Sequence, residues 1–201
     1  MAKRLLDMML SGSGLMVSAP LWAVIATLIK IEDGGPVFFS QERVGRGGRR
    51  FDALKFRSMI VDAEARTGPI QSGENDPRTT RVGRLLRATA MDELPQLWNI
   101  FRGDMSFVGP RALRPGEIEV KGNGLVEKLE DVPGFADRCA VRPGLTGVAQ
   151  IYAPRDVLRR RKFRYDHFYI RRQSFCFDAR LILLSFWITF RGRWEARGRK
   201  L

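Results

Sequence analysis

Two adjacent carboxylates, Asp92 and Glu93, stand in the middle of a strongly basic part of the chain. Six arginines lie close by in the sequence: Arg81, Arg84, Arg87, Arg102, Arg111 and Arg114. Acids placed among fixed positive charges can handle a phosphate group, together with a divalent metal ion that offsets the charge of the acids. The pair therefore indicates phosphate chemistry.

The same residues also allow a purely structural interpretation. Asp92 is a good N-cap for a helix predicted over residues 92–101, and Pro95 is tolerated in its first turn because the missing N–H would be unpaired there. Glu93 would then be a surface acid that complements the positive end of the helix. The surrounding arginines favour a site, because a helix start and several guanidinium groups together attract phosphate.

An aspartate can itself act in phosphoryl transfer. The reaction needs charge neutralisation and an in-line nucleophile, and a carboxylate that attacks phosphorus forms an aspartyl phosphate. Neighbouring positions on a helix diverge by roughly 100°. One acid can therefore attack while the other binds metal or orients a group, and the sequence alone does not assign these roles.

An apolar segment, Leu5 to Ile31, is the second informative feature. Its length approaches the roughly 20 residues that span a bilayer, so a straight transmembrane helix and a cleaved signal peptide are both alternatives. Pro20 disfavours both, because it bends a helix and directly follows the small-residue cleavage site. Basic residues flank both ends, which places both flanks in the cytoplasm. We expect a re-entrant membrane helix over residues 1–32, bent near Ser18 and Pro20.

Charge is unevenly distributed along the chain. The 201 residues contain 35 Lys and Arg against 22 Asp and Glu, a formal net charge of +13. From Arg155 onward there are 14 basic and four acidic residues. Such a block needs an anionic partner, namely nucleic acid, acidic lipid headgroups or phosphorylated substrates. The apolar run 181–190 is too short to span a bilayer, and the aromatic and basic residues around it favour an interfacial helix over a buried one.

Cysteine and histidine offer little catalytic potential. Cys139 and Cys176 belong to no metal-binding pattern, and we expect both to be reduced and partly buried. His167 is the only histidine, and no GxSxG motif accompanies it, so we expect it to be structural. The usual ligand patterns of zinc sites are missing from the sequence.

The remaining patterns predict a mainly helical α+β protein. A compact catalytic domain is expected over 33–201, with interfacial amphipathic helices within about 154–190. We predict strands at 36–41, 51–57 and 105–108, a turn at 45–48, a loop at 67–80, and helices at 59–66, 81–90, 92–101, 115–130, 154–172 and 176–190.

Several short motifs follow one another along the chain. They are Ser18-x-Pro20, Gln41-x-Arg43-x-Gly45, Lys55-Phe56-Arg57-Ser58-Met59, Asp76-Pro77-Arg78, Arg81-Val82-Gly83, Leu86-Arg87, Asp92-Glu93-Leu94-Pro95-Gln96-Leu97-x-Asn99, Gly103-Asp104-Met105-Ser106-x-Val108-Gly109-Pro110-Arg111 and Arg142-Pro143-Gly144-Leu145-Thr146-Gly147-x-x-Gln150. With these motifs the chain resembles the bacterial sugar transferase family, the small monotopic phosphoglycosyl transferases. The resemblance runs nearly end to end.

The resemblance implies a function and a location. Such enzymes move a sugar-1-phosphate from a UDP-sugar to undecaprenyl (polyprenyl) phosphate and release UMP, in the first membrane step of bacterial glycoconjugate assembly. They lie monotopically on the cytoplasmic face of the inner membrane, among anionic lipids, and need Mg²⁺ but no nucleic acid.

The resemblance also implies roles for individual residues. Asp92 would be the nucleophile that carries the phospho-sugar, with Glu93 as its catalytic partner, and both would lie at the metal. The substrate and its phosphates would be held by Arg87, Arg111, Arg142, Gln96, Gln150, Lys55 and Arg57.

One position departs from the family pattern. Members commonly place a proline after Gly-Pro-Arg, where this chain has Ala112, so the placement of Arg111 is less secure and Arg114 could replace it. Two other classes of function stay open at this stage. A non-catalytic membrane scaffold leaves the acid pair unexplained, and a nucleic-acid-binding module leaves the apolar N-terminal segment unexplained.

Overall fold

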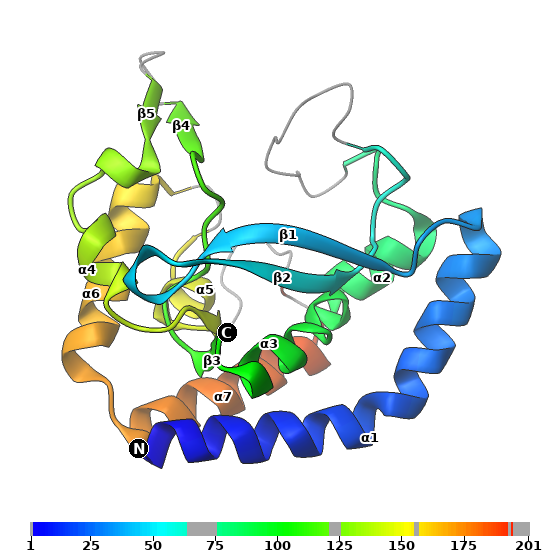
Figure 1. Ribbon diagram of the computed structural model, residues 1–201, viewed down its shortest axis with the longest axis horizontal. Coiled ribbons are helices and arrows are strands. Elements are labelled where there is room, and N and C mark those ends of the chain that lie inside the picture. The colour runs from blue at the N-terminus through cyan, green and yellow to red at the C-terminus, as the bar shows by residue number, and fades with distance from the viewer. Residues whose placement is uncertain (1, 64–75, 121–125, 155–156, 193, 195–201) are drawn as a thin grey trace.

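The computed structural model describes residues 2–63, 76–120, 126–154, 157–192 and 194. It is mainly helical with short strands, in agreement with the α+β prediction (Figure 1). The elements are α1 (Ala2–Asp33), β1 (Phe38–Val44), η1 (Arg46–Gly48), β2 (Arg50–Phe56), α2 (Arg81–Ala88), η2 (Met91–Glu93), α3 (Gln96–Arg102), β3 (Ser106–Val108), β4 (Ile118–Val120), β5 (Val126–Lys128), η3 (Leu129–Asp131), α4 (Phe135–Cys139), β6 (Gly144–Thr146), α5 (Val148–Tyr152), α6 (Arg159–Arg172) and α7 (Phe175–Phe190).

Helix α1 is the apolar segment of the sequence, and it bends partway along its length (Figure 1). Pro20 lies inside the helix and lacks the N–H that would bond to the preceding turn. Ser18 Oγ donates to the carbonyl of Gly14 at 2.6 Å and accepts from Trp22 Nε1 at 3.0 Å. In the described part of the chain, α1 is the helix that is long and apolar enough to cross a membrane.

The predicted strands around residue 45 form an antiparallel hairpin. β1 pairs with β2 in a register that sets Gln41 opposite Ala53, and both strands are longer at the turn than predicted. Gly47 adopts a φ of +67° in the turn, a conformation that favours glycine. The hairpin crosses the front of the molecule between α1 and the β4–β5 region (Figure 1).

Other sequence predictions need correction. The helix predicted over 59–66 is absent from its described part, where Met59 forms a β-bridge with Thr79 and a turn follows; residues 64–66, and 67–75 of the predicted loop, lie outside the described residues. The helix predicted over 115–130 is instead the antiparallel pair β4–β5 followed by η3. Ile118 and Val126 are β-branched and favour a strand, and this preference outweighs the weak helical pattern.

Both helices predicted for the C-terminal part are present, but one of their boundaries differs from the prediction. α7 begins and ends within one residue of the prediction, whereas α6 begins at Arg159 instead of residue 154. α7 has two kinds of surface, because Leu181 and Ile188 are fully buried while Phe186 and Phe190 are exposed. One face of this helix is therefore buried in the core, and the interfacial placement of the other face stays a prediction.

Three clusters of buried side chains hold these elements together. The largest joins α3, β3, α5, α6 and α7 and contains Ile100, Met105 and Tyr169. A second, around Ile25, Phe56 and Leu86, packs the far half of α1 against β2 and α2. The third joins the loop after β3, η3, α4 and α6. The parallel pair β3–β6 crosses the main cluster, and its two ends lead into the loops of the site.

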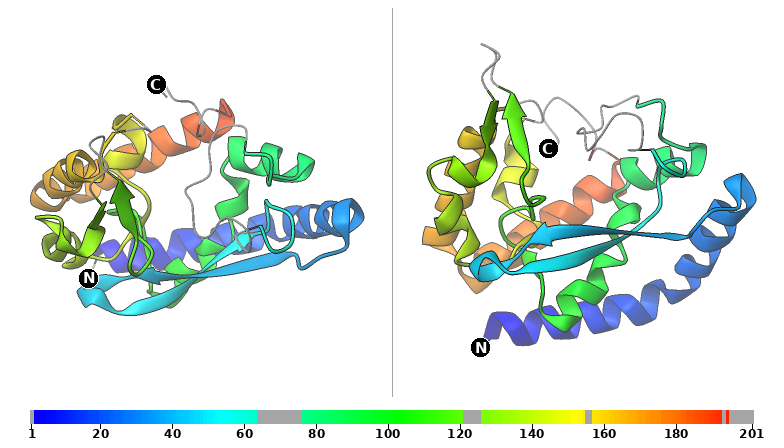
Figure 2. Two further views of the ribbon diagram at one scale, coloured as in Figure 1. Left: turned by 90° about the horizontal axis from the view of Figure 1, so that it is seen from above. Right: turned by 45° about the horizontal axis from the view of Figure 1, so that its top comes forward.

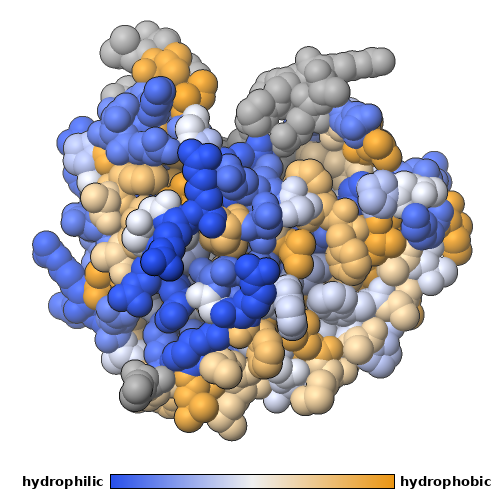
Figure 3. Space-filling view, in the orientation of Figure 1, coloured by the Kyte–Doolittle hydropathy of each residue, from blue (hydrophilic) through white to orange (hydrophobic). Residues whose placement is uncertain are grey.

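Polar and apolar side chains separate on the surface. Figure 3 shows hydrophilic residues gathered over the hairpin and the neighbouring face, and apolar residues along the edge where α1 runs. Many apolar residues of α1 face outward, among them Leu5, Met9, Met16 and Val17. The two views of Figure 2 show that α1 runs along one side of the molecule and that α7 lies across from its N-terminal half.

Candidate active site

Asp92 and Glu93 lie on the short turn η2, between α2 and α3. Ala90 precedes them with a φ of +55°, so the chain turns sharply after α2 instead of beginning a new helix. α3 starts only at Gln96, and neither η2 nor α3 has a side-chain cap. The capping interpretation of Asp92 is therefore wrong. The residue is buried with 8% of its surface exposed, which a cap at the surface does not require.

Lys55 of β2 reaches both acids. Its Nζ lies 2.5 Å from Glu93 Oε1 and 3.8 Å from Asp92 Oδ2. Buried Asn99 of α3 holds β2 at this position, because it accepts from the N–H of Leu54 at 3.0 Å and donates to the carbonyl of Asp52 at 2.7 Å. The lysine is thus fixed relative to the acid pair by a bond network that joins a strand to a helix.

The two carboxyl groups titrate differently. Burial raises the pKa of Asp92 to about 6, with a further rise from Glu93 that Lys55, Arg87 and Arg111 partly oppose. Burial also acts to raise the pKa of Glu93, but Lys55, Arg111 and Arg43 outweigh it and hold this pKa at about 2. Near neutral pH both groups are ionised, and Asp92 is the one that loses its charge first as the pH falls.

Arg111 faces Glu93 from the loop after β3. Its Nη2 lies 3.6 Å from Glu93 Oε1. This loop is held by backbone bonds on both sides: Gly144 donates to the carbonyl of Pro110 at 2.9 Å, and Val44 donates to the carbonyl of Leu113 at 2.9 Å. The loop therefore stays in place although Ala112 stands where the family has a proline, and Arg111 keeps its position beside the pair.

Glycine is required where the two site loops meet. A side-chain carbon on Gly144 would lie 2.0 Å from the backbone nitrogen of Gly109, and one on Gly109 would lie 2.4 Å from the carbonyl oxygen of Arg142. Both distances are shorter than real contacts allow. The close approach explains physically why the two motifs carry glycine at these positions.

A small cleft opens over Glu93. It is lined by Arg43, Ala53, Lys55, Glu93, Gln96, Met105, Arg111, Ala112, Gly144 and Leu145. The structure thus brings four of the predicted site residues to one cleft, with Asp92 beside it.

The other predicted residues lie around this centre or further away. Arg87 acts electrostatically on Asp92 and bonds to Thr79 Oγ1 at 3.4 Å. Arg142 Nε donates to the carbonyl of Gly103 at 2.8 Å, and Gln150 Nε2 donates to the carbonyl of Gly109 at 3.4 Å, so both stabilise the loops.

Arg57 is buried and pairs with Asp33 at the end of α1, and the structure does not bring it to the acid pair.

Several basic residues near the pair in sequence lie at the surface instead of lining the cleft. Arg81 and Arg84 are exposed on α2, and Arg102 pairs with Asp104 at 3.2 Å. His167 Nε2 lies 3.2 Å from the carbonyl oxygen of Gly134, which fits the structural role expected for it. Cys139 is half-buried as expected, but Cys176 is exposed, because it lies at the outward start of α7.

The residues present fit a Mg²⁺ ion held jointly with substrate. In the described part of the chain, no group of three or more acids, histidines and cysteines is placed to bind a metal alone. Mg²⁺ commonly takes one or two carboxylates and completes its shell with substrate phosphates and water. Asp92 and Glu93 supply such a pair of carboxylates.

Sequence reasoning missed two residues of the site. Arg43 lines the cleft, and Asn99 fixes β2 against α3. Both belong to motifs that the sequence analysis recorded, Gln41-x-Arg43-x-Gly45 and the run that ends at Asn99. A polar residue inside an otherwise apolar helical pattern was the available signal for Asn99.

The sequence matches a known protein family over nearly its whole length. The family model of "Bacterial sugar transferase" matches residues 1–192. The exopolysaccharide production protein PSS of Rhizobium leguminosarum bv. phaseoli is 40% identical over 185 residues, which are 90% of each chain.

Two further relatives carry the names of enzymes. The UDP-glucose:undecaprenyl-phosphate glucose-1-phosphate transferase of Xanthomonas campestris pv. campestris is 41% identical over 92% of this chain and 38% of its own length. The undecaprenyl-phosphate glucose phosphotransferase of Komagataeibacter xylinus is 40% identical over 91% of this chain and 35% of its own length. The chain thus spans little more than a third of these two relatives. The family match over nearly every residue shows that the chain belongs to the bacterial sugar transferase family and is a transferase.

Proposed function

We propose that the protein transfers a sugar-1-phosphate from a UDP-sugar to undecaprenyl phosphate, giving polyprenyl-diphosphate-sugar and UMP. The observation that carries the proposal is the buried pair Asp92–Glu93, neutralised by Lys55 and flanked by Arg111. The names of the Xanthomonas and Komagataeibacter relatives supply the donor and acceptor classes.

The proposed reaction has two steps through Asp92. In the first, a carboxylate oxygen of Asp92 attacks the phosphorus that bears the sugar, and the bond from that phosphorus to the bridging oxygen breaks. UMP leaves with the electron pair, and an aspartyl phospho-sugar remains. In the second, an oxygen of the polyprenyl phosphate attacks the same phosphorus and releases the carboxylate of Asp92.

The residues around Asp92 suit these steps. Asp92 is ionised at neutral pH, and its oxygen Oδ2 makes a long contact with Lys55 instead of a tight ion pair. Glu93 stays charged and holds Lys55 and Arg111 beside the donor diphosphate. A Mg²⁺ ion bound by Asp92, Glu93 and the diphosphate would neutralise phosphate charge. Arg87 contributes positive charge on the Asp92 side.

We further propose that α1 is re-entrant and that the chain lies on the cytoplasmic face of the inner membrane, bound to anionic lipids through its basic C-terminal part. Both ends of α1 contact the catalytic domain. Lys3 Nζ donates to Asp178 Oδ2 at 2.5 Å, and Glu32 at the other end accepts from the backbone N–H of Arg81 at 2.6 Å. A helix that crossed the bilayer would leave its ends on opposite sides, so contacts of both ends with one domain support a helix that returns.

The function is tested with purified protein in detergent. UMP release from a panel of UDP-sugars is measured with and without polyprenyl phosphate and Mg²⁺, and sustained release is expected only when both are present. Mass spectrometry of enzyme rapidly quenched with donor and Mg²⁺, but without polyprenyl phosphate, should detect one phospho-sugar on the peptide that contains Asp92. Absence of this adduct from an enzyme that turns over would contradict the mechanism.

The membrane placement is tested separately by cysteine labelling. In a background with Cys139→Ser and Cys176→Ser, the variants Ala2→Cys and Pro36→Cys introduce exposed thiols at the two ends of α1. Gly35 is unsuitable, because a side-chain carbon there would lie 1.7 Å from Arg57 Nη1. A membrane-impermeant reagent should label both variants from the same side, and labelling from opposite sides would reject the re-entrant helix.

A further inference from the structure

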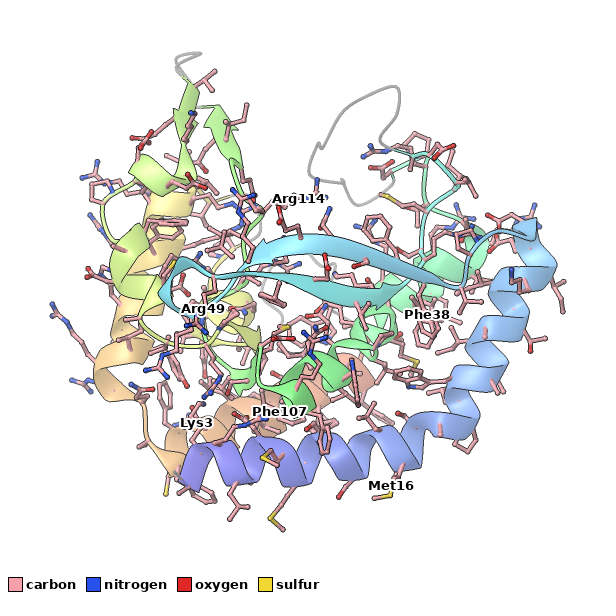
Figure 4. All side chains as sticks on the ribbon, in the orientation of Figure 1. Lys3, Met16, Phe38, Arg49, Phe107 and Arg114 are labelled. Atoms are coloured by element: carbon pink, nitrogen blue, oxygen red, sulfur yellow. The ribbon has the colours of Figure 1, made fainter. Side chains whose placement is uncertain are left out.

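Three guanidinium groups gather on the Glu93 side of the site. Arg43 comes from the end of β1, and Arg111 and Arg114 come from the loop after β3. Arg43 and Arg111 line the cleft together with Lys55 and Glu93. Figure 4 shows Arg114 beside the end of β1, close to where the strand meets this loop. Two of these arginines, Arg43 and Arg114, have no role in the steps proposed above.

Two carboxylates near these arginines have more than one partner each. Glu93 binds Lys55 and Arg111. Glu117 binds Arg159 Nη2 at 2.8 Å with one oxygen, and its other oxygen accepts from the backbone N–H of Arg114 at 3.1 Å. The pKa of Arg43 is lowered to about 10, mainly by burial and also by repulsion from Arg111 and Arg114, which Glu117 and Glu93 oppose. Arg111 and Arg114 thus repel Arg43, and an anion bound among the three groups would relieve this repulsion.

Arg43 is held in a fixed orientation by its own contacts. Nη1 donates to the carbonyl of Ala112 at 3.1 Å, and Nη2 donates to Gln41 Oε1. Guanidinium carries five N–H groups, so these two bonds leave further donors for a phosphate oxygen. The bond to Ala112 also ties Arg43 to the loop that carries Arg111 and Arg114.

Positive charge is divided between the two sides of the acid pair. Arg87 acts on Asp92, Arg43 acts on Glu93, and Arg111 acts on both acids. In an in-line displacement the nucleophile and the leaving group lie on opposite sides of the phosphorus. Cations that neutralise the leaving phosphate must therefore lie apart from the nucleophile, and the Glu93 side offers such cations.

We infer that Arg43, together with Arg111 and Arg114, forms a subsite for the phosphate of the nucleoside monophosphate that leaves. This inference rests on the proposed function for the identity of the nucleotide. It assigns Arg43 to the donor half of the reaction and gives it no part in binding the polyprenyl phosphate. The side chain of Arg114 adds charge at the outer end of the same subsite.

The subsite is tested by equilibrium binding of UMP to the full chain in detergent, measured by titration calorimetry. Arg43→Gln removes the charge and keeps a hydrogen-bonding side chain, and about tenfold weaker UMP binding is expected. Arg50→Gln is the matched control, because Arg50 is exposed on the same hairpin and pairs only with Glu42 among the described residues. The control should bind UMP like the unaltered protein.

Kinetics then separate binding from simple positioning. Arg43→Gln should raise KM for the UDP-sugar about tenfold and leave KM for polyprenyl phosphate unchanged. Arg43→Lys keeps the charge and should recover part of the UMP affinity. Unchanged UMP affinity in folded Arg43→Gln, or a rise in KM for the polyprenyl phosphate alone, would overturn the inference.

Two further outcomes keep the test decisive. Should Arg43→Gln fail to fold, judged by circular dichroism, Arg114→Gln replaces it, and unchanged UMP affinity in that variant would overturn the subsite. A protein that binds UMP through Arg43 but never releases UMP from any UDP-sugar would contradict the proposed function and leave the subsite standing. Normal turnover, with a UMP affinity that does not depend on Arg43 or Arg114, would contradict the subsite and leave the proposed function standing.

Discussion

Lys55 donates from Nζ to Glu93 Oε1 at 2.5 Å, while the nearest oxygen of Asp92 is 3.8 Å away. Because the lysine is shared unequally, the two neighbouring carboxylates differ in their pKa values. Glu93 takes the close ion pair and stays charged, whereas Asp92 keeps the higher pKa and a carboxylate that is free to attack. Pairs of acids whose surroundings drive their pKa values apart are typical of groups with different roles in one reaction.

Replacement of Asp92 by asparagine should abolish adduct formation and raise stability. Because the folded-state pKa of Asp92 is about 6, above its unfolded value, its buried charge destabilises the fold above pH 6 and this cost disappears as the pH falls toward 4. A shift of this size corresponds to about 3 kcal/mol. Thermal denaturation at pH 8 should show a higher Tm for Asp92→Asn, with a smaller difference at pH 5. A lower Tm at pH 8 would contradict the assignment.

Activity should depend on the charge of Asp92. We expect kcat/KM for the UDP-sugar to fall about tenfold per pH unit below about pH 6, as the nucleophile becomes protonated. Glu93→Gln removes a neighbouring negative charge, so the acid limb of its residual activity should move to lower pH. An acid limb that stays at the same pH in Glu93→Gln would show that another group titrates there.

Removal of the lysine should affect both acids. Lys55→Met leaves two buried carboxylates without their common partner, and we expect the free energy of unfolding at pH 7 to fall by about 3 kcal/mol. The acid limb of any remaining activity should move to higher pH, since Lys55 lowers the pKa of both groups. Lys55→Arg keeps the charge and should retain most of the stability. Equal losses in both variants would point to packing as the cause.

Asn99 should stabilise the fold and the site together. Asn99→Ala leaves the N–H of Leu54 and the carbonyl of Asp52 without this partner, which should lower the free energy of unfolding by about 2–3 kcal/mol. Because β2 then loses a fixed position for Lys55, kcat should fall as well. Gln173→Ala, at an exposed position between α6 and α7, is the control and should change neither quantity. Urea denaturation and UMP release measure the two effects.

The site was predictable to the extent that its residues lie in short motifs. The acid pair, Lys55 and Arg111 all meet, although they come from three separate parts of the chain. Spacing alone could not show that Arg57 turns toward Asp33, because the bend of α1 decides where that carboxylate lies. Nor could spacing show that Arg43 lines the cleft, because this depends on how the hairpin packs against the loop after β3.

The fold was predictable where the local pattern was strong and unpredictable where tertiary contacts compete with it. The hairpin, α2 and α7 follow their patterns closely. The region after Pro115 does not, because strand pairing between β4 and β5 outweighs a weak helical period. The start of α3 also shifted, since the left-handed Ala90 and the turn η2 take up the residues that a cap would use.

The attachment of α1 at both of its ends has a mechanical consequence. A freely hinged anchor adapts to a thinner or thicker bilayer by tilting, and the attached domain does not respond. Here Lys3 is bound to α7 at one end and Glu32 to α2 at the other. A change in the depth of the helix in the bilayer would therefore displace α7 and α2 together. α2 leads directly into the turn that carries Asp92, and turnover in vesicles should therefore vary with the acyl-chain length of the lipid.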